Sequence, residues 1–292
     1  MAETILFALA AAFVVLALLA AWLMAGQMTR RRSPDPSTSP SDYGLPFEHV
    51  TFPARDGMRL AGWLIGEGKR PVVIFCAGMF GSMDGDVHLA PHFVKAGLNV
   101  LQFDWRGHGR SDGSRTTLGL RERLDLLGAI DFLQSEGIRR IGLMGFSMGG
   151  AVALRAAAED ARAACVVSDG GFARMESALL GYAMARTGGR GRGLFRAFAR
   201  LVLAMVGLRL GESVYPASPL PVVGRIAPRP VLFIHGADDP FVPPDDQDAL
   251  YDACGEPKQL WRVPGAGHRE VYDLHPDDYA GRVVAFFRAG LI

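Results

Sequence analysis

The chain reads Gly145-Phe146-Ser147-Met148-Gly149-Gly150 between an apolar run, residues 141–144, and a helix-prone stretch, residues 151–154. A serine in the pattern G-x-S-x-G, placed between a strand and a helix, stands on a sharp turn at the edge of a sheet. The glycines are required there because larger side chains would collide with the neighbouring strand and helix. Backbone N–H groups at the start of the helix favour an anion. The stretch therefore predicts an exposed, reactive serine at 147.

From residue 47 onward, short β-rich runs alternate with segments of helical periodicity. Strands are expected at 47–52, 58–65, 72–76, 98–103, 140–144, 163–167, 230–234 and 259–263, and helices at 88–96, 118–134, 149–159 and 276–288. The first two strands flank the turn Arg55-Asp56-Gly57, which is typical of a hairpin. Strands that alternate with helices favour parallel pairing through right-handed crossovers. We therefore expect an α/β fold with a mostly parallel central sheet and helices on both faces.

Residues 172–214 interrupt this alternation, because they carry no strand signal although they lie between two predicted strands. We expect two helices around the glycine-rich stretch 187–193, forming a small lid over the carboxyl ends of the strands. Arg192, Arg196 and Arg200 recur at four-residue steps and so share one helix face. Such a face is either simply solvated, with the apolar residues of the lid packed on the core, or it contacts anionic lipid.

The N-terminal residues differ from the rest of the chain. Residues 5–25 contain no charge, and three arginines follow at 30–32. As a helix this run would be about 31 Å long, which matches the hydrocarbon core of a bilayer. A cleaved signal peptide is the alternative, but residues 1–4 lack its basic region and the apolar run is too long for one. The arginines place the following domain in the cytoplasm by the positive-inside rule.

The expected domain organisation follows from these patterns. A single-pass transmembrane anchor covers 1–29, a Pro/Ser-rich, basic-flanked linker covers 30–46, and one globular domain covers 47–292. The net charge of +1 gives no field that would attract nucleic acid. The three cysteines are widely spaced, which favours buried free thiols over a disulfide framework or a metal site.

A serine hydroxyl needs a base to activate it, and the base needs an acid to orient it. His268 follows the last predicted strand on the glycine-rich loop Gly265-Ala266-Gly267 and is the expected base. Asp239, in the loop after the strand 230–234, is the expected acid. Its neighbour Asp238 is the immediate rival, and Asp169 is a further possibility. His235 ends a buried strand and is expected to be structural.

Two further motifs carry a family resemblance. Residues 56–63 read DGMRLAGW, and residues 103–111 read FDWRGHGRS. With Ser147, Asp239 and His268 in that chain order, residues 47 to the end resemble the α/β-hydrolase superfamily. The first motif is similar to the opening of its lysophospholipase-like and membrane-tethered acyl hydrolases. The second is similar to a structural loop of the family, so the resemblance makes Asp104 and His108 scaffold residues.

The resemblance implies an oxyanion hole built from the backbone N–H groups of Met79 and Met148. One departure affects it, because Ala77 stands where the family usually has a histidine before Gly78. Backbone donors survive this exchange, but the rigidity of the loop is in question.

The function implied is that of a serine hydrolase acting on carboxylic esters or thioesters of acyl, lipid-like substrates through an acyl-enzyme. No metal or organic cofactor is implied. A serine rather than an aspartate at 147 argues against dehalogenase and epoxide-hydrolase chemistry of the same fold. A peptidase and a non-catalytic ligand-binding protein, both of which also occur on this fold, remain the alternatives. The expected partners are thus an acyl substrate and, through the N-terminal helix, a membrane.

Overall fold

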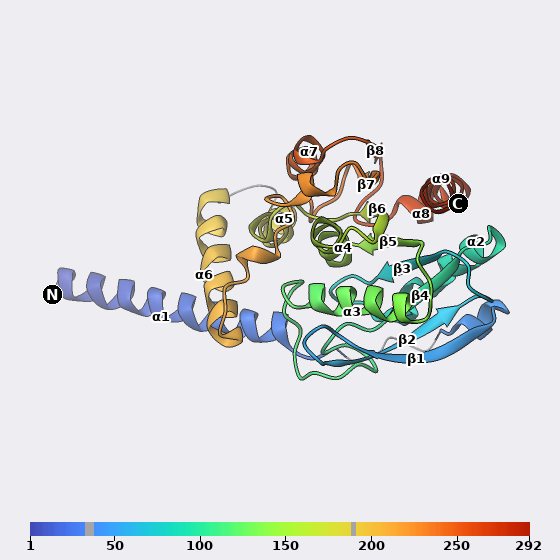
Figure 1. Cartoon of the computed structure of the whole chain (residues 1–292). Helices are drawn as coiled ribbons and strands as arrows, with labels where there is room; N and C mark the ends of the chain where they lie inside the picture. The colour runs from blue at the N-terminus through green and yellow to red at the C-terminus, as the bar shows by residue number, and fades with distance from the viewer. Residues whose placement is uncertain (33–37, 188–190) are drawn as a thin grey trace.

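The computed structural model describes residues 1–32, 38–187 and 191–292, and the side chains at 182–187 and 192 lie outside that description. Its centre is one eight-stranded sheet in the order β1-β2-β4-β3-β5-β6-β7-β8 (Figure 1). The strands are β1 Phe47–Pro53, β2 Arg59–Ile65, β3 Val72–Cys76, β4 Asn99–Phe103, β5 Ile141–Phe146, β6 Ala163–Asp169, β7 Val231–Gly236 and β8 Lys258–Val263. This matches the eight strands expected from the sequence.

The pairing of the strands explains their composition. The hairpin β1–β2 and the pair β2–β4 are antiparallel, and all the other pairs are parallel. In β3, β4, β5 and β7 every residue is buried, because helices cover both faces of the sheet. Such strands read as continuous apolar runs rather than as alternating ones. The mostly parallel sheet predicted from the sequence is confirmed.

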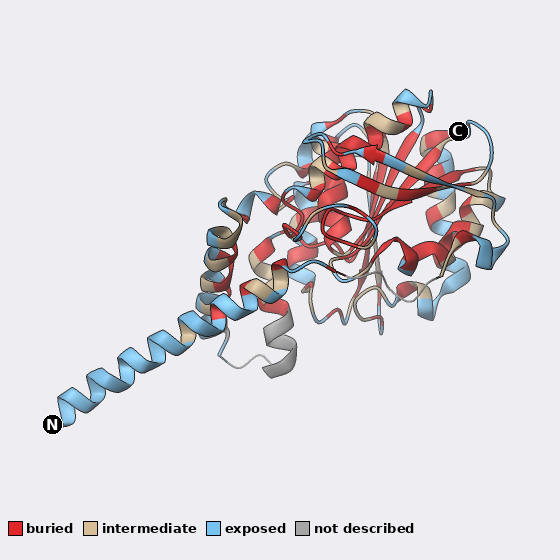
Figure 2. Cartoon of the chain, turned by 90° about the horizontal axis from the view of Figure 1, so that it is seen from below, coloured by how far each residue is buried: buried red, intermediate tan, exposed pale blue. Residues whose placement is uncertain are grey.

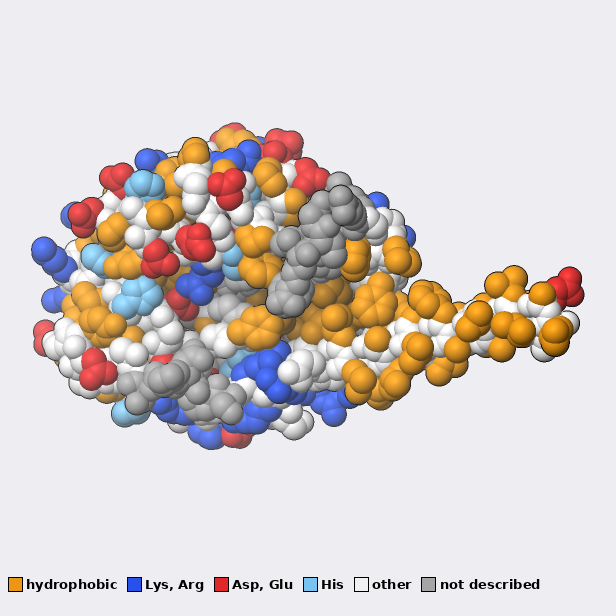
Figure 3. Space-filling view, turned by 180° about the vertical axis from the view of Figure 1, so that it is seen from behind, with side chains coloured by type: hydrophobic (Ala, Val, Ile, Leu, Met, Phe, Trp, Pro, Cys, Tyr) orange, Lys and Arg blue, Asp and Glu red, His pale blue; other side chains and the backbone are white. Residues whose placement is uncertain are grey.

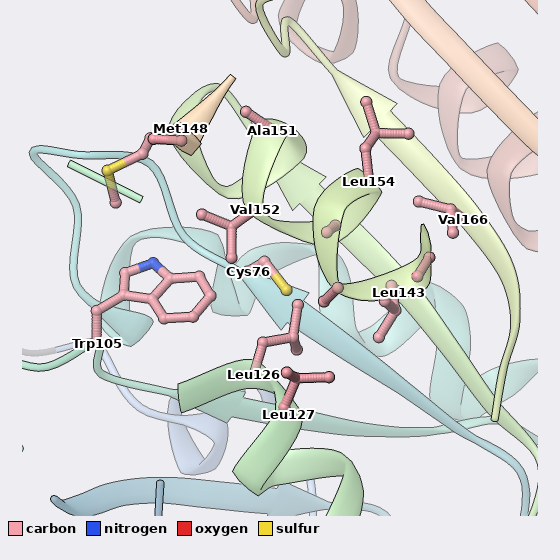
Figure 4. Close-up of a cluster of buried hydrophobic side chains, with 14 of the residues drawn as sticks. Cys76, Trp105, Leu126, Leu127, Leu143, Met148, Ala151, Val152, Leu154 and Val166 are labelled. Atoms are coloured by element: carbon pink, nitrogen blue, oxygen red, sulfur yellow. The ribbon is translucent and has the colours of Figure 1, made fainter. Parts of the chain in front are cut away.

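The helices that cover the sheet form two layers. They are α2 Ala90–Lys95, α3 Glu122–Ser135, α4 Met148–Glu159, α7 Pro244–Ala253, α8 Val271–Leu274 and α9 Pro276–Leu291. Residues of α3 and α4 pack in one hydrophobic cluster with one face of the strands, and those of α2 and α9 pack in a second cluster on the other face. Figure 4 shows Leu126 and Leu127 of α3 and Val152 of α4 in the first cluster, with Cys76 of β3 between them. The three cysteines are free and buried, as expected.

Two helices begin later than their periodicity predicts. The helix expected at 118–134 starts at Glu122, because Leu118 and Gly119 have φ of 57° and 89° and so cannot be helical. The Glu122 carboxylate instead accepts N–H bonds from Thr117 at 2.7 Å and Gly119 at 2.8 Å. The segment expected at 88–96 is split into the 3₁₀ helix η2 Met83–Leu89 and α2. Helix α7 was not predicted at all.

The segment that the sequence analysis expects to form a lid lies between β6 and β7 and is helical. It consists of α5 Met175–Thr187 and α6 Arg192–Leu210, followed by the short 3₁₀ helices η3 Tyr215–Ala217 and η4 Val223–Ile226. Helix α5 lies on the loop after β7, where a β-carbon at Gly181 would overlap the carbonyl oxygen of Phe241. The arginines at 186, 190 and 192 lie outside the described side chains. Arg196 and Arg200 both pair with Glu176 of α5, at 3.5 Å and 3.3 Å.

The N-terminal helix α1, Ala2–Thr29, projects from the domain (Figures 1 and 2). It is long and apolar enough to cross a membrane, with a mean hydropathy of 2.7 over its most apolar window. Only Ala21, Ala25 and Thr29 are buried, where the last turns pack against α6. At this contact the guanidinium of Arg209 lies 3.9 Å from the ring centroid of Trp22. The last turns of α1 and helix α6 are therefore packed directly against each other.

The segment after α1 is bonded to the domain rather than free. Arg30 forms an antiparallel bridge with Arg115, and Arg32 forms a parallel bridge with His108. Figure 3 shows basic side chains gathered where the apolar helix meets the domain. The linker expected over 30–46 is thus docked at its start, and residues 33–37 of it lie outside the described chain. Residues 40–43 form the 3₁₀ helix η1 Pro40–Tyr43.

Candidate active site

Ser147 stands on the turn between β5 and α4, as predicted. Its φ of 53° and ψ of −115° are strained for a non-glycine residue. A β-carbon at Gly149 would overlap the carbonyl oxygen of Cys76 at the end of β3, and one at Gly145 would overlap the backbone of Gly149. The absence of side chains at these two positions lets the turn press against the neighbouring strand. The serine is thereby held at the carboxyl edge of the sheet, pointing away from the core.

The structure brings the predicted base and acid to this serine. His268, after β8, places Nε2 at 2.9 Å from Ser147 Oγ and Nδ1 at 2.7 Å from Asp239 Oδ2. Asp239, after β7, is fixed by the backbone N–H groups of Phe241 and Val242, which donate to Oδ1 at 2.7 Å and 2.9 Å. Its carboxylate is fully buried, whereas the His268 side chain keeps 18% of its surface exposed. The three side chains form one hydrogen-bonded row.

The rival carboxylates have other partners. Asp238 Oδ2 accepts a bond from the N–H of Gly265 at 3.0 Å. Asp169 Oδ2 accepts the hydroxyl proton of Tyr279 at 2.7 Å, and burial raises the pKa of Asp169 against the opposing effect of Arg269. Of the three carboxyl groups considered in the sequence, the one that contacts His268 in the described chain is that of Asp239.

Two other histidines, His235 and His108, contact carbonyl oxygens of the backbone, as is typical of a structural role. His235 is buried, with Nε2 at 2.9 Å from the carbonyl oxygen of Val242, and burial lowers the pKa of the imidazole. His108 is also buried, with its two ring nitrogens each 3.0 Å from a carbonyl oxygen, of Arg106 and of Met79. His108 therefore ties the loop after β4 to the loop after β3.

The loop after β3 carries one of the two expected oxyanion donors. A β-carbon at Gly78 would lie 3.6 Å from Cβ of Ser147, so this loop borders the nucleophile. Met148 is the first residue of α4, and its N–H precedes the intrahelical bonding of that helix. Ala77, which replaces the usual histidine, is buried, and its carbonyl oxygen accepts a bond from Trp105 Nε1 at 2.9 Å. The Trp105 indole therefore supports the loop by a hydrogen bond, which the methyl side chain of Ala77 cannot form.

One residue at the site was missed by the sequence analysis. Arg269 has φ of 62°, and its guanidinium forms an ion pair with Asp86 and lies 4.5 Å from the ring centroid of Phe146. Burial lowers the pKa of Arg269, but the carboxylates of Asp86 and Asp169 outweigh burial, so the net shift is upward. The only sequence signal was its position next to His268. Arg269 links the loop of the histidine to the segment that follows the loop after β3.

A polar cavity of about 360 Å³ opens beside His268. Its lining includes Asp86, His88, Arg269, Tyr272 and Tyr279. In the described part of the chain, no group of three or more His, Cys, Asp or Glu residues gathers that could hold a metal ion. The arrangement offers a nucleophile with an adjacent base, an oriented carboxylate and a polar chamber, which are the parts that acyl transfer requires.

Comparison with known proteins identifies the family. Residues 71–210 match the profile of the alpha/beta hydrolase fold. An uncharacterized protein of Mycobacterium tuberculosis is 31% identical over 251 residues, which cover 80% of this chain and 75% of that protein. The chain belongs to the α/β-hydrolase superfamily. Another relative is the uncharacterized YfhR of Escherichia coli, 29% identical over 84% of this chain and 81% of that protein.

Solved structures of α/β-hydrolases agree with the fold. An esterase of Pyrococcus furiosus, Pf2001, superposes with a TM-score of 0.74 and 25% identity, covering 90% of this chain and 99% of that one. The α/β-hydrolase GrgF of Penicillium sp. sh18 superposes with a TM-score of 0.68 and 26% identity, covering 85% of this chain and 99% of that one. The α/β-hydrolase fold is therefore the framework of this chain.

Proposed function

We propose that this protein is a serine hydrolase that cleaves carboxylic ester or thioester bonds of acyl substrates. The observation that carries the proposal is the His268 ring, which lies within hydrogen-bond distance of Ser147 Oγ on one side and of Asp239 Oδ2 on the other. Ser147 attacks the acyl carbonyl carbon while His268 Nε2 takes the hydroxyl proton. Asp239 holds the ring and stabilises its charged form. One structural relative, Pf2001, is an esterase, which supports the same class of reaction.

The remaining steps use the same groups. The N–H groups of Met79 and Met148 stabilise the charge that develops on the carbonyl oxygen. His268 then returns its proton to the leaving alcohol or thiol, and the acyl group stays on Ser147. Water, deprotonated by His268, attacks the acyl-enzyme, releases the carboxylic acid and restores the serine hydroxyl.

The polar cavity beside His268 bears on the choice among acyl substrates. The two buried carboxylates of its lining already have partners. Asp86 forms an ion pair with Arg269, and Asp169 accepts a hydrogen bond from the Tyr279 hydroxyl. A free ammonium group, which an aminopeptidase must bind, would have to displace one of these partners or use Asp273, which also lines the cavity but is exposed to solvent. The polar lining of the cavity suits instead a neutral, hydrogen-bonding leaving group. This favours an ester or thioester over a peptide.

We also propose that α1 anchors the enzyme in a membrane, with the hydrolase domain on the cytoplasmic side. The long, exposed, apolar surface of α1 supports anchoring. The arginines 30–32 support the orientation, although Arg31 and Arg32 use their guanidinium groups on carbonyl oxygens of the chain rather than only on lipid. Reporter fusions at the two termini would test the orientation, since the opposite topology gives the opposite pattern of reporter activity.

The first experiment is labelling of the detergent-solubilised, full-length protein with a fluorophosphonate probe. Wild type should label, and Ser147→Ala should not. Ser135→Ala is the matched control, because Ser135 is exposed at the end of α3 and its hydroxyl donates to the carbonyl of Phe132. Its labelling should equal that of wild type. A folded wild type that fails to label would overturn the proposal and favour a ligand-binding protein.

Acyl-chain profiling then tests the substrate class. With a series of p-nitrophenyl esters, kcat/KM should rise as the acyl chain lengthens from acetate to octanoate and beyond. A clear preference for acetate, with no gain from longer chains, would contradict a lipid-like acyl substrate and leave the serine hydrolase chemistry intact.

A further inference from the structure

The loop after β3, residues 77–81, is held by contacts that come from outside the sheet. Trp105 bonds the carbonyl of Ala77, and His108 Nε2 lies 3.0 Å from the carbonyl oxygen of Met79. The next residue, Phe80, keeps 68% of its surface exposed, although it directly follows the proposed oxyanion donor. Its ring is contacted by the guanidinium of Arg32, whose Cζ lies 4.7 Å from the ring centroid.

Arg32 also reaches the loop by a second route. Its N–H donates to the carbonyl of Gly107 at 2.8 Å, and its carbonyl accepts from the N–H of Gly109 at 3.1 Å. These two bonds enclose His108, the residue that bonds the carbonyl of Met79. Arg32 therefore supports the peptide between Met79 and Phe80 from both sides. Its side chain lies over the Phe80 ring, and its backbone bonds flank His108, whose imidazole contacts the Met79 carbonyl.

The same side chain is fastened to the apolar helix. Arg32 Nη2 donates to the carbonyl oxygens of Gln27 at 3.1 Å and Met28 at 3.3 Å, in the last turn of α1. The residue is only 8% exposed. Arg32 thus joins the end of α1 to residues 77–81, which we call the oxyanion loop because Met79 is a proposed oxyanion donor. A displacement of α1 relative to the domain would therefore move Phe80 and Met79.

We propose that Arg32 is a positioning residue for the oxyanion loop, so that the end of the N-terminal helix belongs to the catalytic unit. The inference rests on the proposed hydrolase function. Loss of one oxyanion donor costs about 10²- to 10³-fold in kcat. Misplacement of a donor that is still present should cost a part of that, about 5- to 20-fold. Substrate binding in the ground state should change little.

The adjacent arginine supplies the matched control. Arg31 is docked on the same part of the domain, where Nη2 donates to the carbonyls of Gly109 at 2.8 Å and Ser111 at 3.0 Å. In the part of the chain that the structure describes, its hydrogen bonds go to carbonyls of residues 109–113 and not to the oxyanion loop. Removal of Arg31 should therefore loosen the docking of the segment without touching Phe80, which separates positioning from general anchoring.

The experiment measures p-nitrophenyl acetate hydrolysis by the full-length protein in detergent micelles. Arg32→Met should lower kcat about 5- to 20-fold with KM within about twofold of wild type. Arg32→Lys should recover part of kcat, because a lysine ammonium can also lie over an aromatic ring. Arg31→Met should keep the wild-type kcat. Phe80→Ala should resemble Arg32→Met, and the double variant should be no slower than the slower single one.

Several outcomes would overturn the inference. One is a wild-type kcat for Arg32→Met, and another is an equal loss in Arg31→Met, which would make the effect one of docking alone. If Arg32→Met fails to fold, the exposed Phe80→Ala variant decides, and a wild-type kcat there counts against the inference. Failure of wild type to react with fluorophosphonate would instead overturn the proposed function, which keeps the two failures distinct.

Discussion

The two halves of the candidate site are held in different ways. Ser147, Asp239 and His268 each follow the carboxyl end of a strand of the parallel sheet, β5, β7 and β8, and are fixed by close backbone contacts. We call these residues the core half. The oxyanion loop, residues 77–81, is instead fastened by side chains of Trp105, His108 and Arg32. We call this the peripheral half.

The difference shows where order in the site comes from. The core half is fixed by the packing of the sheet, which also stabilises the whole fold. The peripheral half depends on a few hydrogen bonds and one cation–ring contact, each worth about 1 kcal/mol. Changes in the core half should therefore abolish folding or catalysis, whereas changes in the peripheral half should lower kcat only in part.

The largest effect is expected from Gly149→Ala. The added β-carbon would overlap the carbonyl oxygen of Cys76, and backbone on both sides leaves no side chain that could give way. We expect no folded protein, measured as loss of soluble monodisperse protein and of the thermal transition. Gly281→Ala is the control, since a β-carbon there meets nothing within 4 Å and α9 should gain about 0.5–1 kcal/mol. A folded, active Gly149→Ala variant would break the distinction between the halves.

The next effect is that of Asp239→Asn. The amide cannot replace the carboxylate that faces His268 Nδ1, so the ring loses its orientation and its charged form loses its partner. We expect kcat to fall about 10³- to 10⁴-fold with the thermal transition nearly unchanged. Asp238→Asn should stay within a few-fold of wild type, because that carboxylate accepts a bond from the N–H of Gly265 and does not contact His268 in the described part of the chain. Similar losses in both variants would contradict the assignment of the acid.

A smaller, graded effect is expected from Trp105→Phe in the peripheral half. The substitution removes the bond to the Ala77 carbonyl and leaves a buried acceptor unsatisfied, which should cost about 1–3 kcal/mol of stability. We expect kcat to fall about 3- to 10-fold at unchanged KM. Trp63→Phe is the control, because Trp63 is also buried but its Nε1 has no hydrogen-bond partner in the described chain. Equal losses of kcat would indicate a packing effect alone.

The smallest effect concerns Asp160, just after the far end of α4. The bonds from the Arg162 side chain, against opposing desolvation, lower the pKa of Asp160 to about 2. Because this lies below the unfolded value of about 3.9, the stabilisation is present above about pH 4 and is lost as the pH falls toward 2. Asp160→Asn should cost ~1 kcal/mol at pH 7, since the Arg162 side chain is partly exposed.

Denaturant titrations from pH 7 down to pH 2 would measure this difference. The gap between wild type and Asp160→Asn should close as the pH falls. Asp112→Asn, in an ion pair whose partners are both about half exposed, should behave like wild type throughout. A gap that persists at pH 2 would mean that packing, and not charge, is responsible. Activity should not change, because the site lies at the other end of α4.

The core half was predictable from the sequence because its signals are local. A glycine-flanked serine between a strand and a helix, and polar residues directly after strands, fix positions at one edge of a parallel sheet. For the peripheral half, the family resemblance pointed to Met79 and to His108 as a scaffold residue, but the contacts that fasten the loop were not predictable. Arg32 and Phe80, or Arg269 and Asp86, are far apart in sequence and meet through side-chain contacts that leave no periodic pattern. The late start of α3 has the same cause, since Glu122 bonds backbone groups that precede it.

The continuous helix from Ala2 to Thr29, bonded to the domain as soon as it ends, also limits how the enzyme meets its substrate. With α1 inserted in a bilayer, the domain cannot tumble on a loose tether. It keeps one orientation and one height above the lipid, and it diffuses laterally with its entrance at a constant angle. Substrates dissolved in the same leaflet then reach the enzyme by diffusion in two dimensions, whereas soluble esters must reach it by diffusion through the surrounding water.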